Sequence, residues 1–383
     1  MNGDKRNAPI ETLLAEHIAA RDFPSAVYMV AEGNHIVFEG AMGNAVREPE
    51  TRVAKIETIY DLASLTKPLI TTLLCALRIE QTELSLDERV ALHLAEFDTH
   101  DKRAITLRQL LTHTSGLPAW RPLAVLAKGE RRRVLSIIAN APLEAAPGTL
   151  VRYSDLGFIT LGFLLERLTG ASLAEIARAE IFAPLKLHHT FFNPPATLRD
   201  EIAASETGNF YERAMAEAET AATTNESQSW REHSIWGEVH DGNAYFLGGA
   251  AGHAGLFSNA RETFRIAQQF LASQTILLAP ETCALFRTNM TEGMEEARSM
   301  GWQLAATKDS TAGQDLSPDS FGHLGFTGTS CWIDPTRGRT FILLTNRTHA
   351  HALPFVNING VRRRFHSLAT AALDEHKERQ NAT

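Results

Sequence analysis

The chain has 383 residues, of which 44% are hydrophobic and 21% charged, so it is long enough for one large globular core or for two lobes. Its formal net charge of −8 argues against nucleic acid or an anionic membrane surface as a partner. The cysteines Cys75, Cys283 and Cys331 lie far apart and show no metal-ligand spacing, so we expect buried thiols, no metal and no cofactor.

Both ends of the chain combine a helical pattern with a hairpin pattern. Residues 9–20 (PIETLLAEHIAA) have helical periodicity, and residues 25–43 (SAVYMVAEGNHIVFEGAMG) hold two β-rich runs around Glu32-Gly33-Asn34. Near the other end, residues 329–347 (TSCWIDPTRGRTFILLTNR) form a second hairpin pattern, and residues 361–379 indicate an amphipathic helix. We expect the two hairpins to pair into one antiparallel sheet flanked by helices.

The middle of the chain is mostly helical in pattern, with helices expected at 69–81, 106–113, 131–141, 155–170 and 172–185. Residues 199–240 are polar and weakly periodic, which predicts long surface loops. The order predicts an α+β fold: an α/β lobe from residues 1–75 and 255–383, an inserted helical lobe from residues 76–254, and a cleft between them.

No apolar stretch near the N-terminus is long enough for a signal peptide, and no uninterrupted apolar window reaches the roughly eighteen residues of a membrane span. We therefore expect no membrane span and a cytoplasmic protein by default. A periplasmic location follows if a leader has been removed from the chain. Nothing in the sequence indicates the oligomeric state.

The first candidate for chemistry is Ser64-Leu65-Thr66-Lys67, at the start of the apolar helical pattern in YDLASLTKPLITTLLCAL. Residues three apart share a helix face, and a helix N-terminus offers free N–H groups to an oxyanion. Lys67 can hold the Ser64 hydroxyl and, if burial lowers its pKa, accept the proton. The structural alternative is an N-cap serine beside a lysine that reaches the solvent.

The second candidate is Tyr153-Ser154-Asp155, before an apolar helical pattern. A tyrosine can act as general acid or base when cations lower its pKa. Asp155 can hydrogen-bond the lysine or a substrate amide, or simply cap the helix.

The third candidate is the glycine-rich segment 321–330 (FGHLGFTGTS), which contains His323 and leads into a β-rich run. Glycine allows a ligand to approach a strand edge, whose N–H can serve an oxyanion hole. The alternative is a glycine-rich turn with an incidental histidine.

The order SLTK, YSD, HLG resembles the serine β-lactamase and penicillin-binding-protein superfamily, whose motifs are SxxK, a Ser-Asp-Asn element and KTG. The tyrosine-first middle element is similar to class C β-lactamases and their relatives, which include esterases, DD-peptidases and D-amino-acid peptidases. Residues 107–118, 248–260 and 332–347 resemble the same branch, and the resemblance covers roughly residues 9–370.

The resemblance implies a β-lactamase/transpeptidase-like fold and an acyl-enzyme mechanism. Ser64 takes the place of the acylated nucleophile, Lys67 that of its activating partner, and Tyr153 that of the residue that relays the proton to the leaving group. The backbone N–H groups of Ser64 and Phe326, which follows Gly325, would form the oxyanion hole.

Two departures from the family pattern affect the expected substrate. His323 stands where KTG has lysine and is mostly neutral at pH 7, and Asp155 stands where an asparagine would donate to a substrate amide. Both residues, with Gly325, are expected to contact the substrate, and a β-lactam carboxylate should bind less well. A serine hydrolase acting on carboxylic esters or on D-residue amide or peptide-like substrates is therefore expected, and the alternatives are a true class C-type β-lactamase and a non-catalytic binder of peptidoglycan fragments.

Three further polar residues occur in glycine-containing segments of the chain. His253 lies in GGAAGHAGLF, and His240-Asp241 lies in GEVHDGNA. We expect all three to organise loops, and the alternative for His240-Asp241 is a contact with the substrate.

Overall fold

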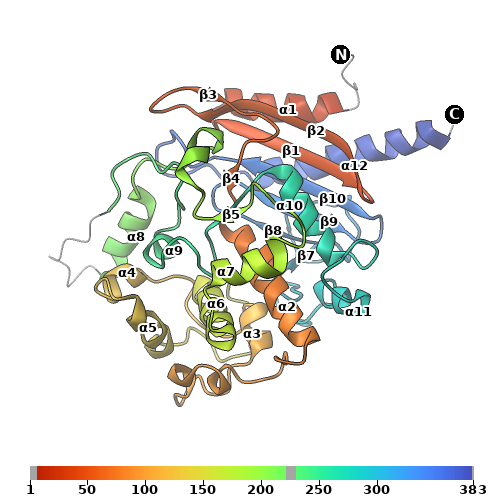
Figure 1. Cartoon of the computed structure of the whole chain (residues 1–383). Helices are drawn as coiled ribbons and strands as arrows, with labels where there is room; N and C mark the ends of the chain where they lie inside the picture. The colour runs from red at the N-terminus through yellow and green to blue at the C-terminus, as the bar shows by residue number, and fades with distance from the viewer. Residues whose placement is uncertain (1–6, 221–229, 382–383) are drawn as a thin grey trace.

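A seven-stranded antiparallel sheet lies at the centre of the fold, and both ends of the chain build it (Figure 1). The computed structural model describes residues 7–220 and 230–381. The central neighbours β1 and β10 pair from Ala26↔Thr345 to Glu32↔Arg339, which confirms the predicted pairing of the two hairpins. In spatial order the strands are β3 (Arg52–Val53), β2 (His35–Val46), β1 (Ser25–Glu32), β10 (Arg339–Thr345), β9 (Ser330–Asp334), β8 (Phe321–Leu324) and β7 (Gln303–Leu304).

Strand β1 is buried on both faces, because helices cover the sheet on both sides. Alternate side chains of a strand point to opposite faces. Tyr28 and Val30 therefore belong to a core shared with the terminal helices α1 (Ala8–Ala19) and α12 (Asn359–Asn381), which lie together on the outer face (Figure 1). Met29 faces the larger core on the other side.

The remaining helices lie on the opposite side of the sheet (Figure 1). They are α2 (Leu73–Glu80), α3 (Leu107–Leu111), α4 (Leu123–Leu126), α5 (Val134–Asn140), α6 (Asp155–Thr169), α7 (Leu173–Ala177), α8 (Phe210–Thr220), α9 (Gly242–Phe246), α10 (Ala260–Ala267) and α11 (Pro280–Cys283). The mixed α+β architecture confirms the expected fold class. The division into lobes at 75/76 and 254/255 stays a prediction.

Within the described residues, no single helix is both long and apolar enough to cross a bilayer. Only α6 together with Leu173–Phe182, two segments bent by 77°, meets the length and composition criterion as a pair. A second sheet of three short strands, β4 (Tyr60–Asp61), β6 (Leu256–Ser258) and β5 (Phe191–Phe192), was not predicted, because such short strands carry no readable periodicity.

The prediction of long surface loops at 199–240 is wrong for much of the described part of that segment. It contains the helix α8, and Ile235 and Trp236 are buried. Its polar groups are satisfied internally: the buried Arg231 donates to the carbonyl oxygens of Val239 and His240 at 2.5 and 2.6 Å. Internal hydrogen bonding of this kind allows a polar, weakly periodic segment to be buried. Residues 221–229 of the segment lie outside the described part of the chain.

The buried histidine His366 in α12 predicts acid sensitivity of the fold. Its Nδ1 donates to the Thr311 carbonyl at 2.7 Å, and burial lowers its pKa to about 4. Below pH 6.5 the unfolded chain binds a proton that the folded chain does not, so stability falls as pH drops towards 4. Between pH 7 and pH 5 this single group should lower the free energy of unfolding by about 2 kcal/mol.

Urea unfolding of the wild type and of His366→Asn at the two pH values checks this, because the asparagine amide can still donate to Thr311 without titrating. The variant should lose about 2 kcal/mol of the pH dependence. An unchanged pH dependence in the variant would contradict the assignment.

Candidate active site

Ser64 lies in a tight turn between β4 and the buried helix. The turn is a 3₁₀ segment, η2 (Ala63–Leu65), followed by a π-helical segment, η3 (Lys67–Thr72), that continues into α2. Ala63 has φ of 48°, a left-handed conformation that is strained for a residue with a Cβ. Asp61 Oδ1 accepts the Ala63 N–H at 2.8 Å and holds this conformation just before the serine.

The loop after β8 fixes the serine turn from the other side. The Thr327 and Thr329 hydroxyls donate to the carbonyl oxygens of Asp61 and Leu62 at 2.8 and 3.0 Å. A Cβ on Gly325 would lie 2.6 Å from the Leu62 carbonyl oxygen, so only glycine permits this approach. The predicted site residue Gly325 therefore also has a structural task.

Lys67 is fully buried, and its Nζ has partners from three distant segments. It lies 3.0 Å from Ser64 Oγ, 3.1 Å from the His253 carbonyl oxygen and 2.6 Å from Asp155 Oδ1. Burial by itself lowers the pKa of Lys67, but the Asp155 carboxylate and Tyr153 together outweigh burial and raise it. The condition under which Lys67 would accept the serine proton, a pKa lowered by burial, is therefore not met, and Lys67 is an ammonium ion in the resting site.

Tyr153 lies among cations and rings beside the serine. Lys67 Nζ lies 4.9 Å from the Tyr153 ring centroid, and burial raises the pKa of Tyr153 although Lys67 and Ser64 act against this. The His113 ring lies 4.5 Å from the Tyr153 ring, centroid to centroid, and the Arg298 guanidinium carbon lies 5.6 Å from the Tyr153 centroid. Tyr153 is therefore a neutral phenol in the same cleft as the nucleophile and close to the ammonium.

His323 lies on the other side of Tyr153, with 5.9 Å between the ring centroids. Its Nδ1 faces the Leu324 carbonyl oxygen at 2.9 Å, and because a carbonyl only accepts, Nδ1 carries the proton. Burial, and then the charges of Lys67 and Arg298, lower the pKa of His323 well below its usual value. His323 is thus neutral at pH 7, with a buried Nε2 that has no protein partner in the described residues.

The glycine-rich loop before β6 supplies the carbonyl that contacts Lys67. A Cβ on Gly252 would lie 1.9 Å from the Phe158 carbonyl oxygen, and the Gly252 carbonyl accepts from the Thr71 hydroxyl at 2.7 Å. The loop is thus held between α6 and η3, and this places the His253 carbonyl on Lys67. The sequence predicted only that His253 organises a loop. Its contact with Lys67 was missed because it is made by the backbone carbonyl, which any residue has.

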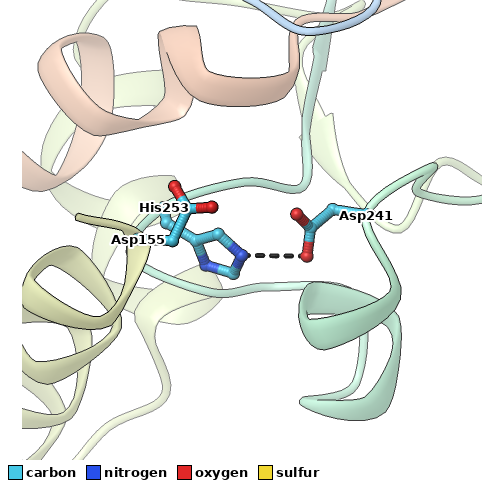
Figure 2. Close-up of side chains that lie close together, drawn as sticks. All are labelled: Asp155, Asp241 and His253. Atoms are coloured by element: carbon cyan, nitrogen blue, oxygen red, sulfur yellow. Dashed lines mark hydrogen bonds and ion pairs between the residues drawn. The ribbon is translucent and has the colours of Figure 1, made fainter. Parts of the chain in front are cut away.

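Asp155, Asp241 and His253 place possible metal-ligand atoms within 4.8 Å of one another (Figure 2). His253 Nε2 lies 2.8 Å from Asp241 Oδ1, whereas Asp155 pairs with Lys67. The Lys67 ammonium thus already supplies a positive charge at this cluster, and a metal ion there would have to compete with it.

A cleft of about 630 Å³ brings most of the predicted site residues together. Within the described residues, the backbone N–H groups of Ser64 and Phe326 donate to no protein acceptor. Arg298, which the sequence did not single out, and His240 and Asp241 also line the cleft. Its lining includes the predicted residues Ser64, Tyr153, Asp155, His323, Gly325 and Phe326, while Lys67 lies buried behind Ser64.

An α+β fold that carries an SxxK serine at its cleft defines a class of serine hydrolases. The chain belongs to the β-lactamase family, whose model, described as Beta-lactamase, matches residues 10–359.

One curated relative, from Escherichia coli K12, is named "Putative D-alanyl-D-alanine carboxypeptidase"; it is 32% identical over 356 residues, which cover 86% of this chain and 79% of the relative. Two solved structures share the fold. A penicillin-binding protein homologue from Caulobacter crescentus has a TM-score of 0.71 and 20% identity over 96% of this chain and 98% of its own. EstCE1, described as a hydrolase with promiscuous acyltransferase activity, has a TM-score of 0.70 and 22% identity over 96% and 98%.

Replacing Asp155 tests the charge of Lys67. In Asp155→Asn the carboxylate no longer raises the pKa of Lys67. The effect of burial should then dominate, and the pKa of Lys67 should fall towards neutral pH. The measurement is the rate at which a fluorophosphonate labels Ser64, plotted against pH. Between about pH 6 and 9 the wild type should show no inflection from the titration of Lys67, whereas the variant should show one. Asp155→Glu, which keeps the carboxylate, is the matched control, and identical profiles for all three chains would contradict the raised pKa.

Proposed function

We propose that the protein is a hydrolase that works through an acyl-enzyme on Ser64 and acts on carboxylic esters or on D-residue amide or peptide-like substrates. The observation that carries this proposal is the contact of Lys67 Nζ with Ser64 Oγ, with the Tyr153 ring centroid 4.9 Å from Nζ and Asp155 paired with the lysine. The name of the Escherichia coli relative supports a D-residue peptide substrate, and the description of EstCE1 as a hydrolase with acyltransferase activity is consistent with transfer of an acyl group.

In acylation, Ser64 Oγ attacks the carbonyl carbon of the substrate. Tyr153 takes the serine proton while giving its own hydroxyl proton to the leaving group, so the phenol stays neutral overall. The Lys67 ammonium stabilises the negative charge that develops on both oxygens, and Asp155 keeps the lysine charged. The N–H groups of Ser64 and Phe326 bind the oxyanion of the tetrahedral intermediate.

Deacylation uses the same groups in reverse order. A water molecule attacks the acyl carbon and gives a proton to Tyr153, whose own proton returns to Ser64 Oγ as the ester bond breaks. The acid product leaves, and each group regains its starting protonation state. The shuttle requires the tyrosine hydroxyl to reach Ser64, and both side chains line the same cleft.

A comparison of two chromogenic substrates ranks ester hydrolysis against β-lactam hydrolysis. The kcat/KM for p-nitrophenyl acetate should exceed that for a chromogenic cephalosporin by well over tenfold, with both lost in Ser64→Ala. The physical reason is that the Asp155 carboxylate, which stands in place of an asparagine, cannot donate a hydrogen bond to the amide of a cephalosporin. Cephalosporin turnover at comparable efficiency would reverse the ranking in favour of a class C-type β-lactamase.

Covalent labelling of Ser64 can exclude a non-catalytic binder of peptidoglycan fragments. A binder has no need of a reactive serine, so a fluorophosphonate would leave Ser64 unlabelled. Labelling of the wild type, followed by mass spectrometry with Ser64→Ala as the blank, decides between an enzyme and a binder.

Removing the Tyr153 hydroxyl should lower kcat/KM most for substrates whose leaving group needs a proton. Tyr153→Phe should lower kcat/KM for an alkyl ester or a D-alanyl amide by about 10²–10⁴-fold, the usual contribution of a general acid. The loss should be smaller for p-nitrophenyl acetate, because p-nitrophenolate leaves without a proton and Tyr153 then only has to accept the serine proton. Equal losses on both kinds of substrate would show that protonation of the leaving group adds nothing to the role of Tyr153.

A further inference from the structure

His113 is a buried neighbour of Tyr153 whose ring packs against the phenol. Only 1% of the residue is exposed, and it does not line the cleft. The centroids of the two rings are 4.5 Å apart, with 32° between the ring planes, and the Phe158 ring of α6 lies 5.0 Å from the imidazole. Because a protein interior is closely packed, the imidazole limits the positions that the Tyr153 ring can take.

His113 also holds the backbone on both sides of Tyr153. Its carbonyl oxygen accepts the Arg152 N–H at 2.7 Å, and its Nδ1 accepts the Ser154 N–H at 3.0 Å. Ser154 is the N-cap of α6, so the second hydrogen bond also joins His113 to the start of that helix. One residue thus binds the chain before and after the tyrosine and contacts the ring between these two points.

The imidazole of His113 is neutral in the resting site. Nδ1 accepts an N–H and therefore carries no proton, so the proton of the ring is on Nε2. Burial, and then the charges of Arg298 and Lys67, lower the pKa of His113 well below its usual value. A protonated ring would lose its hydrogen bond with Ser154 and would add a further cation near two existing ones.

The backbone position of His113 is one that glycine usually fills. His113 follows Thr112, the C-cap of α3, and its φ of 60° lies in the left-handed region. A residue with a Cβ is strained there, and the Nε2 of this ring is buried with no acceptor in the described residues. Both features are unfavourable for the fold, and such features cluster at functional sites, so they indicate that the imidazole has a task beyond ending the helix.

We propose that His113 is a positioning residue that fixes the Tyr153 phenol for proton transfer at Ser64. This inference rests on the proposed function, in which Tyr153 takes the serine proton and gives its own proton to the leaving group. The transfer needs the phenol oxygen within hydrogen-bond reach of its partners, and a misplacement of about 1 Å can lower a rate about 10²-fold. Since His113 lies outside the lining of the cleft, it acts through the tyrosine and not on the substrate.

Two esters with the same acyl group test this role. Ethyl acetate needs a proton on its leaving group, whereas p-nitrophenyl acetate does not. In His113→Asn, asparagine tolerates the left-handed φ and its side-chain oxygen can accept the Ser154 N–H, so the main loss is the ring. The variant should lower kcat/KM for ethyl acetate about 10–100-fold and that for p-nitrophenyl acetate by a smaller factor. In a Tyr153→Phe background the same substitution should change both values by less than about twofold, and a full additional loss there would overturn the proposal.

Two further variants control this comparison. His349 is also buried, its Nε2 accepts the Arg47 N–H at 2.8 Å, and it does not line the cleft. His349→Asn therefore removes a comparable imidazole and should leave the ratio of the two kcat/KM values unchanged; a changed ratio would show that any loosened core has this effect and would overturn the proposal. His113→Gly suits the backbone position and decides the question even if His113→Asn does not fold, because a wild-type ratio in it would also overturn the proposal.

A measurement without turnover separates this inference from the proposed function. The chain has five tyrosines, so labelling with 3-fluorotyrosine gives few ¹⁹F resonances, and Tyr153→Phe assigns the one that matters. This resonance should be sharp in the wild type and in His349→Asn, and it should broaden or split in His113→Asn, because the phenol can move into the space that the imidazole leaves. If the wild type hydrolyses neither ester while this broadening is present, the proposed function fails and the positioning of Tyr153 by His113 stands. If the resonance stays sharp in His113→Asn, the inference is overturned whether or not the wild type is active.

Discussion

The ion pair between Lys67 and Asp155 determines how the centre of the molecule is built. An ammonium group that is fully buried is tolerated only when its charge is balanced and its hydrogen bonds are made. The partners of Lys67 come from the serine turn, from the start of α6 and from the glycine-rich loop before β6. Burying this single charge therefore requires three distant segments to meet at one point, and that point is the base of the cleft.

The close approach of these segments depends on residues without side-chain bulk. At Gly252 a Cβ would collide with the Phe158 carbonyl, and at Gly325 it would collide with the Leu62 carbonyl. The first contact brings the loop before β6 against α6, and the second brings the loop after β8 against the segment that carries Ser64. The strained φ of Ala63 persists because the turn is held from both sides by hydrogen bonds to Asp61 and Leu62.

Local patterns in the sequence predict the features that depend on local spacing. Both hairpins and the long helix α6 have clear periodicity, and the i, i+3 spacing of Ser64 and Lys67 identifies a pair on one helix face. The raised pKa of Lys67, the carbonyl contact of His253 and the presence of Arg298 follow instead from tertiary neighbours. The structure of 199–240 also depends on tertiary neighbours. Its sequence predicts loops because periodicity gives no sign that polar groups such as Arg231 are hydrogen-bonded to backbone carbonyls inside the fold.

The electrostatics of the cleft show why motif positions alone mislead about substrate. Comparing His323 with lysine, and Asp155 with asparagine, suggests a site that has lost positive character. In the fold, however, the negative charge of Asp155 is balanced by Lys67. Arg298 adds a positive charge to the cleft, and the pairing of its segment with β7, and of β7 with β8, places it there. The potential at a cleft is the sum over all charges that face it, so the substitution of one motif residue can be offset from another strand. The charge of this cleft is therefore set by the neighbours of the motifs as well as by the motifs themselves.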